Sequence, residues 1–278
     1  MTEQSNVPIV YLRPSKGWLG LNLKELWRYR ELIYFLTWRD IKVRYKQAVL
    51  GIAWALLQPI LTMVITSVVF GVLLKVPSGD VPYPVFVFSA LLPWQLFATS
   101  LQKSSQSLIG NSNLLTKIYF PRLIIPLSSV LAVMLDFAIS SVMLIGMMLF
   151  YKVQPSWQMF WLIPLVILAI IAALAVGLWL SALNVQYRDI QHMVPFIVQI
   201  WMYASPVVYP IETIPAGILR TLYGLNPMVG VIQGFRWALF GGTPPDFTLL
   251  ISSVVVVGLF ISGLFYFRRM EKTFADIV

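Results

Sequence analysis

Long apolar stretches without charged residues constrain this chain more than any other feature of its sequence. The core of a bilayer is about 30 Å thick, and a helix needs about 20 mainly apolar residues to cross it. Six stretches are candidates for such crossings, and the sequence therefore predicts an all-α integral membrane protein with six transmembrane helices. The predicted crossings are 48–74, 81–102, 123–151, 159–183, 193–209 and 247–267.

Composition supports this fold class. Hydrophobic residues make up 59% of the 278 residues and charged residues only 11%, against about 25% charged residues in an average soluble domain. The net charge of +9 is also compatible with nucleic-acid binding. Because Lys and Arg lie outside the apolar stretches, as membrane topology requires, we expect membrane lipids and no nucleic acid as partners.

The distribution of Lys and Arg predicts the orientation in the membrane. Six crossings place both termini on one side. If that side is the cytoplasm, only Lys75, Lys152, Arg220 and Arg236 of the 20 basic residues lie outside, as the positive-inside rule favours. The first 47 residues are polar and basic and contain no cleavable signal. We predict a cytoplasmic N-terminus (1–47), a six-span domain (48–267) and a cytoplasmic tail (268–278).

The segment 211–246 is too apolar for a solvated loop, yet Gly and Pro interrupt it repeatedly. Irregular backbone survives at membrane depth only where protein covers it. We therefore predict a re-entrant hairpin of short helices between spans five and six, while a partly ordered outer loop is the alternative. The spacing of Gly230 and Gly234 permits close helix contact, although alone it is a weak signal.

The segment 22–47 has the pattern of an amphipathic interfacial helix. Its apolar residues share one helical face, opposite a row of Lys and Arg. Phe35 and Leu36 fall off that face, so we expect a break near Thr37. The residues of the apolar face are Leu23, Leu26, Trp27, Ile33, Tyr34, Ile41 and Tyr45.

The sequence lacks the residues that several kinds of chemistry require. No Lys follows a Gly anywhere, so the chain lacks a P-loop and any ATP must be handled by a partner. There is no Cys, and His192 is the only His, which excludes Cys and His metal clusters. We expect no catalytic residue, no metal and no cofactor bound by this chain.

Asp136 is the only acidic residue deep inside a predicted span. An intramembrane carboxylate is a functional candidate by default. The alternative is a structural hydrogen bond to Ser128, Ser129, Ser140 or a neighbouring helix. We favour the structural role because an unpaired charge at that depth is costly.

Short motifs in a common order give the chain a family resemblance that covers nearly its whole length. They resemble the bacterial ABC transporter permeases that export polysaccharides, including O-antigen, capsule and teichoic acid. The motifs are Arg44-Tyr45-Lys46 with Leu50-Gly51, Trp54 and Gln58-Pro59; Asn111 with Leu114-Leu115, Lys117 and Phe120-Pro121-Arg122; Tyr187-Arg188-Asp189; Leu225-Asn226-Pro227; and Arg269-Met270-Glu271-Lys272-Thr273-Phe274-Ala275-Asp276.

This resemblance implies a function and a set of partners. It implies a homodimer in the bacterial cytoplasmic (inner) membrane that moves glycans linked to polyprenyl pyrophosphate. It also implies two ABC ATPase subunits that hold ATP and Mg. The same resemblance implies that cytoplasmic loops of this chain contact these subunits. By resemblance, the ATPase-coupling candidates are Asn111, Leu114, Leu115, Lys117, Phe120, Pro121, Arg122, Tyr187, Arg188 and Asp189.

The substrate so implied suggests two further groups of residues. A pyrophosphate head is attracted by basic residues near the inner leaflet, although positive-inside anchoring explains the same charges equally well. The head-group candidates are Arg28, Arg30, Arg39, Lys42, Arg44 and Lys46. Aromatic rings can stack on sugar faces along a channel, although an interfacial belt is the commoner place for them. The channel candidates are Trp54, Trp94, Phe97, Trp201, Tyr203 and Tyr209.

Two rival functions fit the sequence less well. An ion-coupled secondary transporter is disfavoured because intramembrane acids are few and no inverted repeat is visible. A membrane-embedded lipid- or glycan-processing enzyme needs a carboxylate or histidine constellation that this sequence lacks.

Overall fold

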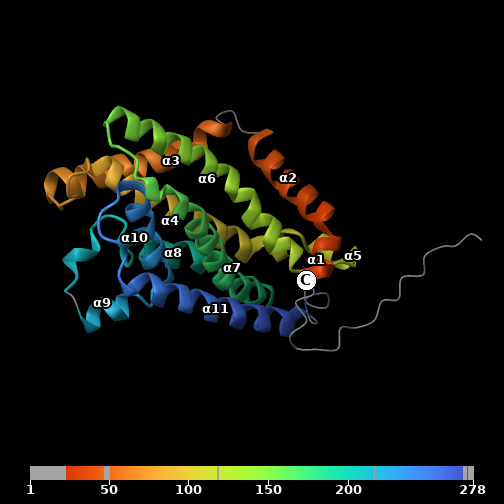
Figure 1. Cartoon of the computed structure of the whole chain (residues 1–278). Coiled ribbons are helices and arrows are strands. Elements are labelled where there is room, and N and C mark those ends of the chain that lie inside the picture. Colours follow the sequence, from red (N-terminus) through yellow and green to blue (C-terminus); the bar gives the residue numbers. More distant parts are fainter. Residues whose placement is uncertain (1–22, 47–50, 118, 216, 272–273, 275–278) are drawn as a thin grey trace, which may run out of the picture.

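The computed structural model describes residues 23–46, 51–117, 119–215, 217–271 and 274. Every regular element in these ranges is helical. The long helices run roughly side by side, as Figure 1 shows, with α1, α5 and the end of α11 at one end of the molecule and α9 at the other. This arrangement confirms the predicted all-α class.

The helix α4 (Tyr83–Gly110) lies at the centre of the bundle. It packs against α7 (Leu162–Gln186), α6 (Ile124–Phe150), α10 (Pro227–Phe240) and α3 (Gly51–Thr66). Its most apolar stretch is mostly buried, whereas the other long helices expose most of theirs. A helix that is apolar all round is suited to such a central position.

Five helical stretches in the described ranges are long and apolar enough to cross a membrane. They are Leu56–Leu73, Tyr83–Gly110, Ile124–Phe150, Trp157–Gln186 and Phe247–Glu271. They correspond to the predicted spans one, two, three, four and six. The first contains the end of α3 and the π-helix η1 (Ser67–Leu73), and the last is α11 (Phe247–Glu271).

The predicted fifth span contains a shorter helix, α8 (Ile190–Tyr203). Its 14 residues extend over about 21 Å at 1.5 Å per residue, which is less than the bilayer core. After α8 the chain passes through turns at 204–209 before the 3₁₀ turn η3 (Ile211–Thr213). A complete fifth crossing therefore stays a prediction.

The N-terminal segment breaks at a different place from the one predicted. Helix α1 (Leu23–Arg28) is followed by a turn at Tyr29, and α2 (Arg30–Lys46) then continues through Thr37 without interruption. The predicted break near Thr37 is wrong because α2 lies along α6, where the Thr37 hydroxyl donates a hydrogen bond to the Ser128 carbonyl at 3.4 Å. Tertiary packing decided this boundary.

The apolar residues of this segment divide between two surfaces. Leu36, which lies off the predicted apolar face, is buried among the residues at the end of the bundle. Trp27 and Tyr34 of the predicted face are instead about 70% exposed, and the neighbouring Phe35 and Trp38 are more than half exposed. An exposed aromatic surface beside basic side chains has the composition of an interfacial segment.

Two short helices fill the segment between α8 and α11. The helix α9 (Ile218–Tyr223) is exposed, whereas α10 is buried against α4, α7 and α11. Asn226 starts α10, because its side chain accepts a hydrogen bond from the Met228 backbone N–H at 3.1 Å. The predicted short helices are present in this segment, and the re-entrant hairpin itself stays a prediction.

Three glycines allow helices to approach closely. A Cβ atom on Gly230 would lie 2.8 Å from the Cα of Leu249 in α11, and one on Gly234 would lie 2.6 Å from Leu165 in α7. A Cβ on Gly263 would lie 2.6 Å from the Ala175 carbonyl oxygen, a backbone atom that cannot rotate away. The predicted close contact at Gly230 and Gly234 is confirmed.

Substituting Gly263 should separate α11 from α7. We expect Gly263→Ala to lower the free energy of unfolding by roughly 1–3 kcal/mol through overpacking. Gly258→Ala is the matched control in the same helix, because a Cβ there meets no atom within 4 Å. Thermal unfolding in detergent measures both variants, and equal stability of the two would contradict the packing described here.

Candidate functional site

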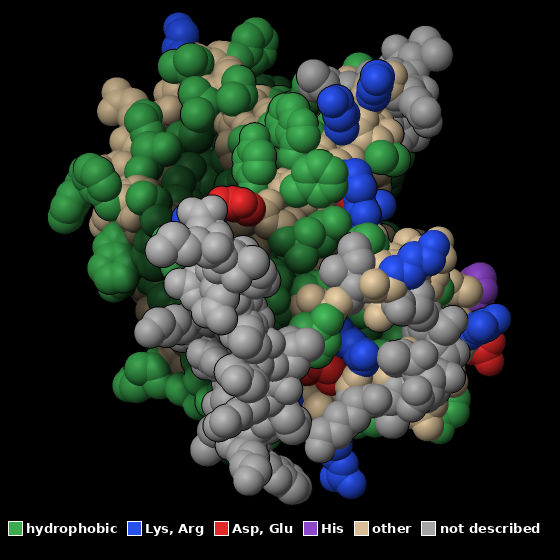
Figure 2. Space-filling model, turned by 90° about the vertical axis from the view of Figure 1, so that its right-hand side faces the viewer, with side chains coloured by type: hydrophobic (Ala, Val, Ile, Leu, Met, Phe, Trp, Pro, Cys, Tyr) green, Lys and Arg blue, Asp and Glu red, His purple; other side chains and the backbone are tan. Residues whose placement is uncertain are grey.

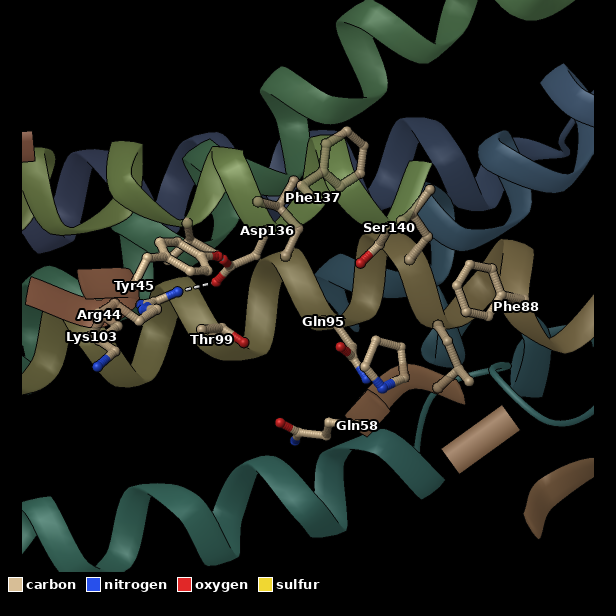
Figure 3. Close-up of a pocket in the computed structure, with 15 residues that line it drawn as sticks. Arg44, Tyr45, Gln58, Phe88, Gln95, Thr99, Lys103, Asp136, Phe137 and Ser140 are labelled. Atoms are coloured by element: carbon tan, nitrogen blue, oxygen red, sulfur yellow. Dashed lines mark hydrogen bonds and ion pairs between the residues drawn. The ribbon is translucent and has the colours of Figure 1, made fainter. Parts of the chain in front are cut away.

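A cavity of about 350 Å³ opens between α2, α3, α4 and α6 (Figure 3). Its wall is mainly apolar, but charged and polar side chains lie along one part of it. Such a mixture is typical of ligand-binding cavities. The cavity is lined by Arg44, Tyr45, Gln58, Pro59, Phe88, Leu91, Leu92, Gln95, Leu96, Thr99, Lys103, Val133, Asp136, Phe137 and Ser140.

Asp136 forms an ion pair with Arg44 and accepts a hydrogen bond from the Tyr45 hydroxyl. Both partners come from α2, so the predicted bond to a neighbouring helix is present, while the structural role of Asp136 stays a prediction. Ser128, one of the expected serine partners, instead donates a hydrogen bond to the Ile125 carbonyl of its own helix. Burial and the hydrogen bond to Asp136 raise the pKa of Tyr45 to about 12, which keeps its hydroxyl protonated and able to donate.

Lys103 adds a third charged group at the same end of the cavity. It extends from α4 below Arg44 and Tyr45 in Figure 3. The ion pairs found in the described ranges do not include it. Sequence reasoning missed Lys103 because it follows a predicted span, where a basic residue is the ordinary case. The helical spacing of Gln95, Thr99 and Lys103 is the signal that identifies it.

The six basic head-group candidates are separated by the structure. Arg39 donates to both Asp40 and the Asn111 side-chain oxygen at 2.7 Å. Arg44 is the only one of the six that lines the cavity. The exposed ones, Arg28, Arg30, Lys42 and Lys46, remain on the surface of α1 and α2. Lys and Arg side chains are spread over this end of the molecule in Figure 2.

The first coupling segment is tied to two other parts of the chain. Its helix, α5 (Ser112–Lys117), follows directly after α4. Leu115 and Phe120 are each 6% exposed and pack into this chain's own core with Leu36, whereas Lys117 is exposed and Leu114 and Pro121 are half-buried.

Arg122 links this segment to the tail. Its guanidinium donates to the Glu271 carbonyl, and its backbone N–H donates to the Glu271 carboxylate at 3.2 Å. The second coupling segment, Tyr187, Arg188 and Asp189, is exposed between α7 and α8. The two segments therefore differ, because buried side chains hold the first in place, whereas the second is exposed.

The aromatic channel candidates lie apart from this cavity. Trp94 and Phe97 are 3% and 0% exposed, and Phe97 contacts the edge of Trp201 with 5.2 Å between ring centroids. Packed in this way, Trp94 and Phe97 present no face on which a sugar could stack. Tyr209 shares a hydrogen bond with Tyr223, and Tyr203 is half exposed. The Trp54 side chain lies outside the described part of the chain.

Among the described residues, no group of three or more His, Asp or Glu side chains is placed to hold a metal ion. What the cavity offers is a cationic end, Arg44 and Lys103 beside Asp136, and an uncharged polar wall further along α4. Polar groups at membrane depth face either protein or a water-filled cavity. Long apolar helices around such a cavity define a multi-pass membrane protein of the transporter class.

The comparison with known families identifies this class further. The model of the ABC-2 type transporter family matches residues 31–240, which include the cavity and both coupling segments. The chain therefore belongs to the ABC-2 type transporter family, as its resemblance predicted.

Curated relatives match over nearly the whole length. The O-antigen export system permease protein RfbA of Myxococcus xanthus is 32% identical over 260 residues, 92% of this chain and 98% of that protein. A protein of the same name from Klebsiella pneumoniae is 30% identical over 89% of this chain and 95% of its own length. The polysialic acid transport protein KpsM of Escherichia coli is 25% identical over 84% and 91%.

The Arg44–Asp136 pair should behave as a coupled unit. Both side chains are less than a third exposed, so Asp136→Leu leaves a poorly solvated cation and should lower the free energy of unfolding by about 1–2 kcal/mol. The double variant Arg44→Met/Asp136→Leu should recover most of this loss, and Asp136→Asn, which keeps an acceptor, should lose less. Thermal unfolding of the wild type, Asp136→Leu, Arg44→Met, the double variant and Asp136→Asn measures the coupling, and simple additivity of Asp136→Leu and Arg44→Met in the double variant would contradict it.

Proposed function

We propose that this chain is the permease, or channel-forming, subunit of an ATP-driven exporter that moves lipid-linked polysaccharide across the bacterial cytoplasmic membrane. The observation that carries the proposal is the full-length similarity to O-antigen export permeases. Capsule and teichoic acid type glycans belong to the same substrate class. The polysialic acid transport relative supports polysaccharide as the shared cargo.

Energy for transport comes from a partner in this proposal. The chain has no P-loop, so two ABC ATPase subunits bind ATP and Mg, and two copies of this chain form the pore. Both termini and the coupling segments face the cytoplasm, in agreement with the basic end of the molecule. Motion of the ATPases reaches the spans through α5, which is rooted in the core by Leu115.

The cationic end of the cavity fits the head of the lipid carrier. Arg44 and Lys103 come from two different helices at the same end of the cavity, and a pyrophosphate can accept hydrogen bonds from both. Asp136 holds Arg44 in place when no anion is bound. The exposed cations of α2 attract the same head group from the membrane surface.

Assembly with the ATPase should depend on the exposed part of the first coupling segment. Tyr119 is 67% exposed next to buried Phe120, so Tyr119→Asp should reduce co-purification of the ATPase while the permease alone stays folded. Leu115→Asp should damage both, because it places a charge in this chain's own core. Pull-down yield and thermal unfolding separate the two effects.

The purified permease alone should show no ATP hydrolysis, while its complex with the ATPase should show vanadate-sensitive hydrolysis. Hydrolysis by the permease alone, with contaminants excluded, would contradict the proposed division of roles. Full assembly of Tyr119→Asp would show that this surface does not contact the ATPase.

Removing exposed charge from α2 should weaken the response to the lipid carrier. Lys42 and Lys46 are exposed and take part in none of the ion pairs of the described ranges. Each change to Gln should raise the concentration of polyprenyl pyrophosphate lipid needed to stimulate ATPase activity by about fivefold, since one charge contributes about 1 kcal/mol near a membrane. Lys152→Gln, at the opposite end of α6, is the control and should have no effect. If Lys42→Gln and Lys46→Gln need no more lipid than the control Lys152→Gln, the α2 charges serve to anchor the helix at the membrane surface and not to attract the lipid head group.

A further inference from the structure

The central part of α4 is partly exposed at only two positions. From Val85 to Leu101 every residue is buried except Gln95 and Thr99. These two positions are four residues apart, and Lys103 follows after four more, so all three lie on one face of the helix. Gln58 approaches this face from α3 across the cavity, as Figure 3 shows.

These uncharged polar groups have no partner within the described part of the chain. The amides of Gln58 and Gln95 and the hydroxyl of Thr99 make no side-chain hydrogen bond there; only the backbone carbonyl of Gln58 is used, by Thr62. Elsewhere on α4 the buried Ser89, Ser105 and Ser107 hydroxyls each bond to a carbonyl of their own helix, whereas the buried Ser100 and Ser104 hydroxyls have no partner among the described residues and do not line the cavity. The cavity groups are therefore left available to water or a ligand.

A polar group left open at membrane depth is costly unless it contacts water or a ligand. An amide and a hydroxyl are each both donor and acceptor, and so are the hydroxyls of a sugar. Phe88, Leu92 and Phe137 on the same wall supply apolar surface for the carbon faces of a sugar ring. An anionic lipid head would instead favour the charged end at Lys103.

We propose that Gln58, Gln95 and Thr99 form a hydrated polar stripe that hydrogen-bonds the hydroxyl groups of the glycan during its passage. The proposal rests on the proposed function and adds to it the residues that contact the sugar. It places that contact on uncharged amide and hydroxyl groups, whereas the aromatic candidates Trp94 and Phe97 are packed inside the protein.

The stripe is tested first by water access. The chain has no native cysteine. In the single variants Gln95→Cys and Thr99→Cys, a charged thiol reagent can therefore label only the introduced cysteine. Both should react in the purified complex with the ATPase. Val142→Cys, 70% exposed on the outer surface of α6, should stay protected by the surrounding lipid. No labelling at either stripe position would overturn the proposal.

Ligand protection then separates sugar from lipid. Polyprenyl pyrophosphate carrying an oligosaccharide should slow labelling of Thr99→Cys, and bare polyprenyl pyrophosphate should not. Equal protection by both lipids would assign the stripe to the carrier and overturn the proposal. If neither lipid stimulates the ATPase activity of the wild-type complex, the proposed function itself fails, an outcome that the wild type alone reveals.

Substitution tests the contribution to transport. Gln95→Leu and Thr99→Val should each weaken stimulation by the oligosaccharide-linked lipid by about fivefold, the effect of one lost hydrogen bond. The response to bare polyprenyl pyrophosphate should be unchanged, and Gln95→Asn should restore part of the loss. Thr221→Val, exposed on α9 and outside the cavity lining, is the matched control. Wild-type stimulation of both stripe variants would overturn the proposal.

Discussion

The burial of α4 is the constraint on which the rest of the structure depends. On one side, Gly177 of α7 lets its backbone approach so closely that a Cβ there would lie 2.6 Å from the Ser104 hydroxyl. Asn184 of α7 adds a hydrogen bond from its side chain to the Ser105 carbonyl at 3.0 Å. This side of α4 is closed by its tight packing against α7, and the cavity lies on a side that faces α2, α3 and α6.

The sequence predicts the long helices well and their neighbours less well. A charge-free apolar stretch has few alternatives to a spanning helix, so spans two, three and six agree closely with α4, α6 and α11. The predicted break in the N-terminal segment is at the wrong place because helical periodicity assumes a single buried face. Helix α2 has two environments, since Leu36 meets α6 while Tyr34 remains exposed.

The candidate site could be predicted only in part, for a related reason. Asp136 is conspicuous in an apolar span, but Arg44 lies 92 residues away in sequence, and nothing in either segment indicates that they pair. Aromatic residues were assigned to the channel by chemistry alone, which says nothing of the side of a helix that neighbours cover. Nothing in the residue types of Gln95 and Thr99 marks them as part of a site. Only their place on the exposed face of α4, in the cavity wall, distinguishes them.

If the proposed function holds, the distribution of charge along the cavity suits the passage of a long chain rich in hydroxyl groups. Charged groups are confined to the end formed by Arg44, Lys103 and Asp136, where an anionic head can be held firmly. Beyond it the polar groups are uncharged, and each hydrogen bond exchanged with water contributes only about 1 kcal/mol. Weak and equivalent contacts let one sugar replace the next without a deep energy minimum. A wall with further charged residues would hold a passing polymer at fixed positions and slow its movement.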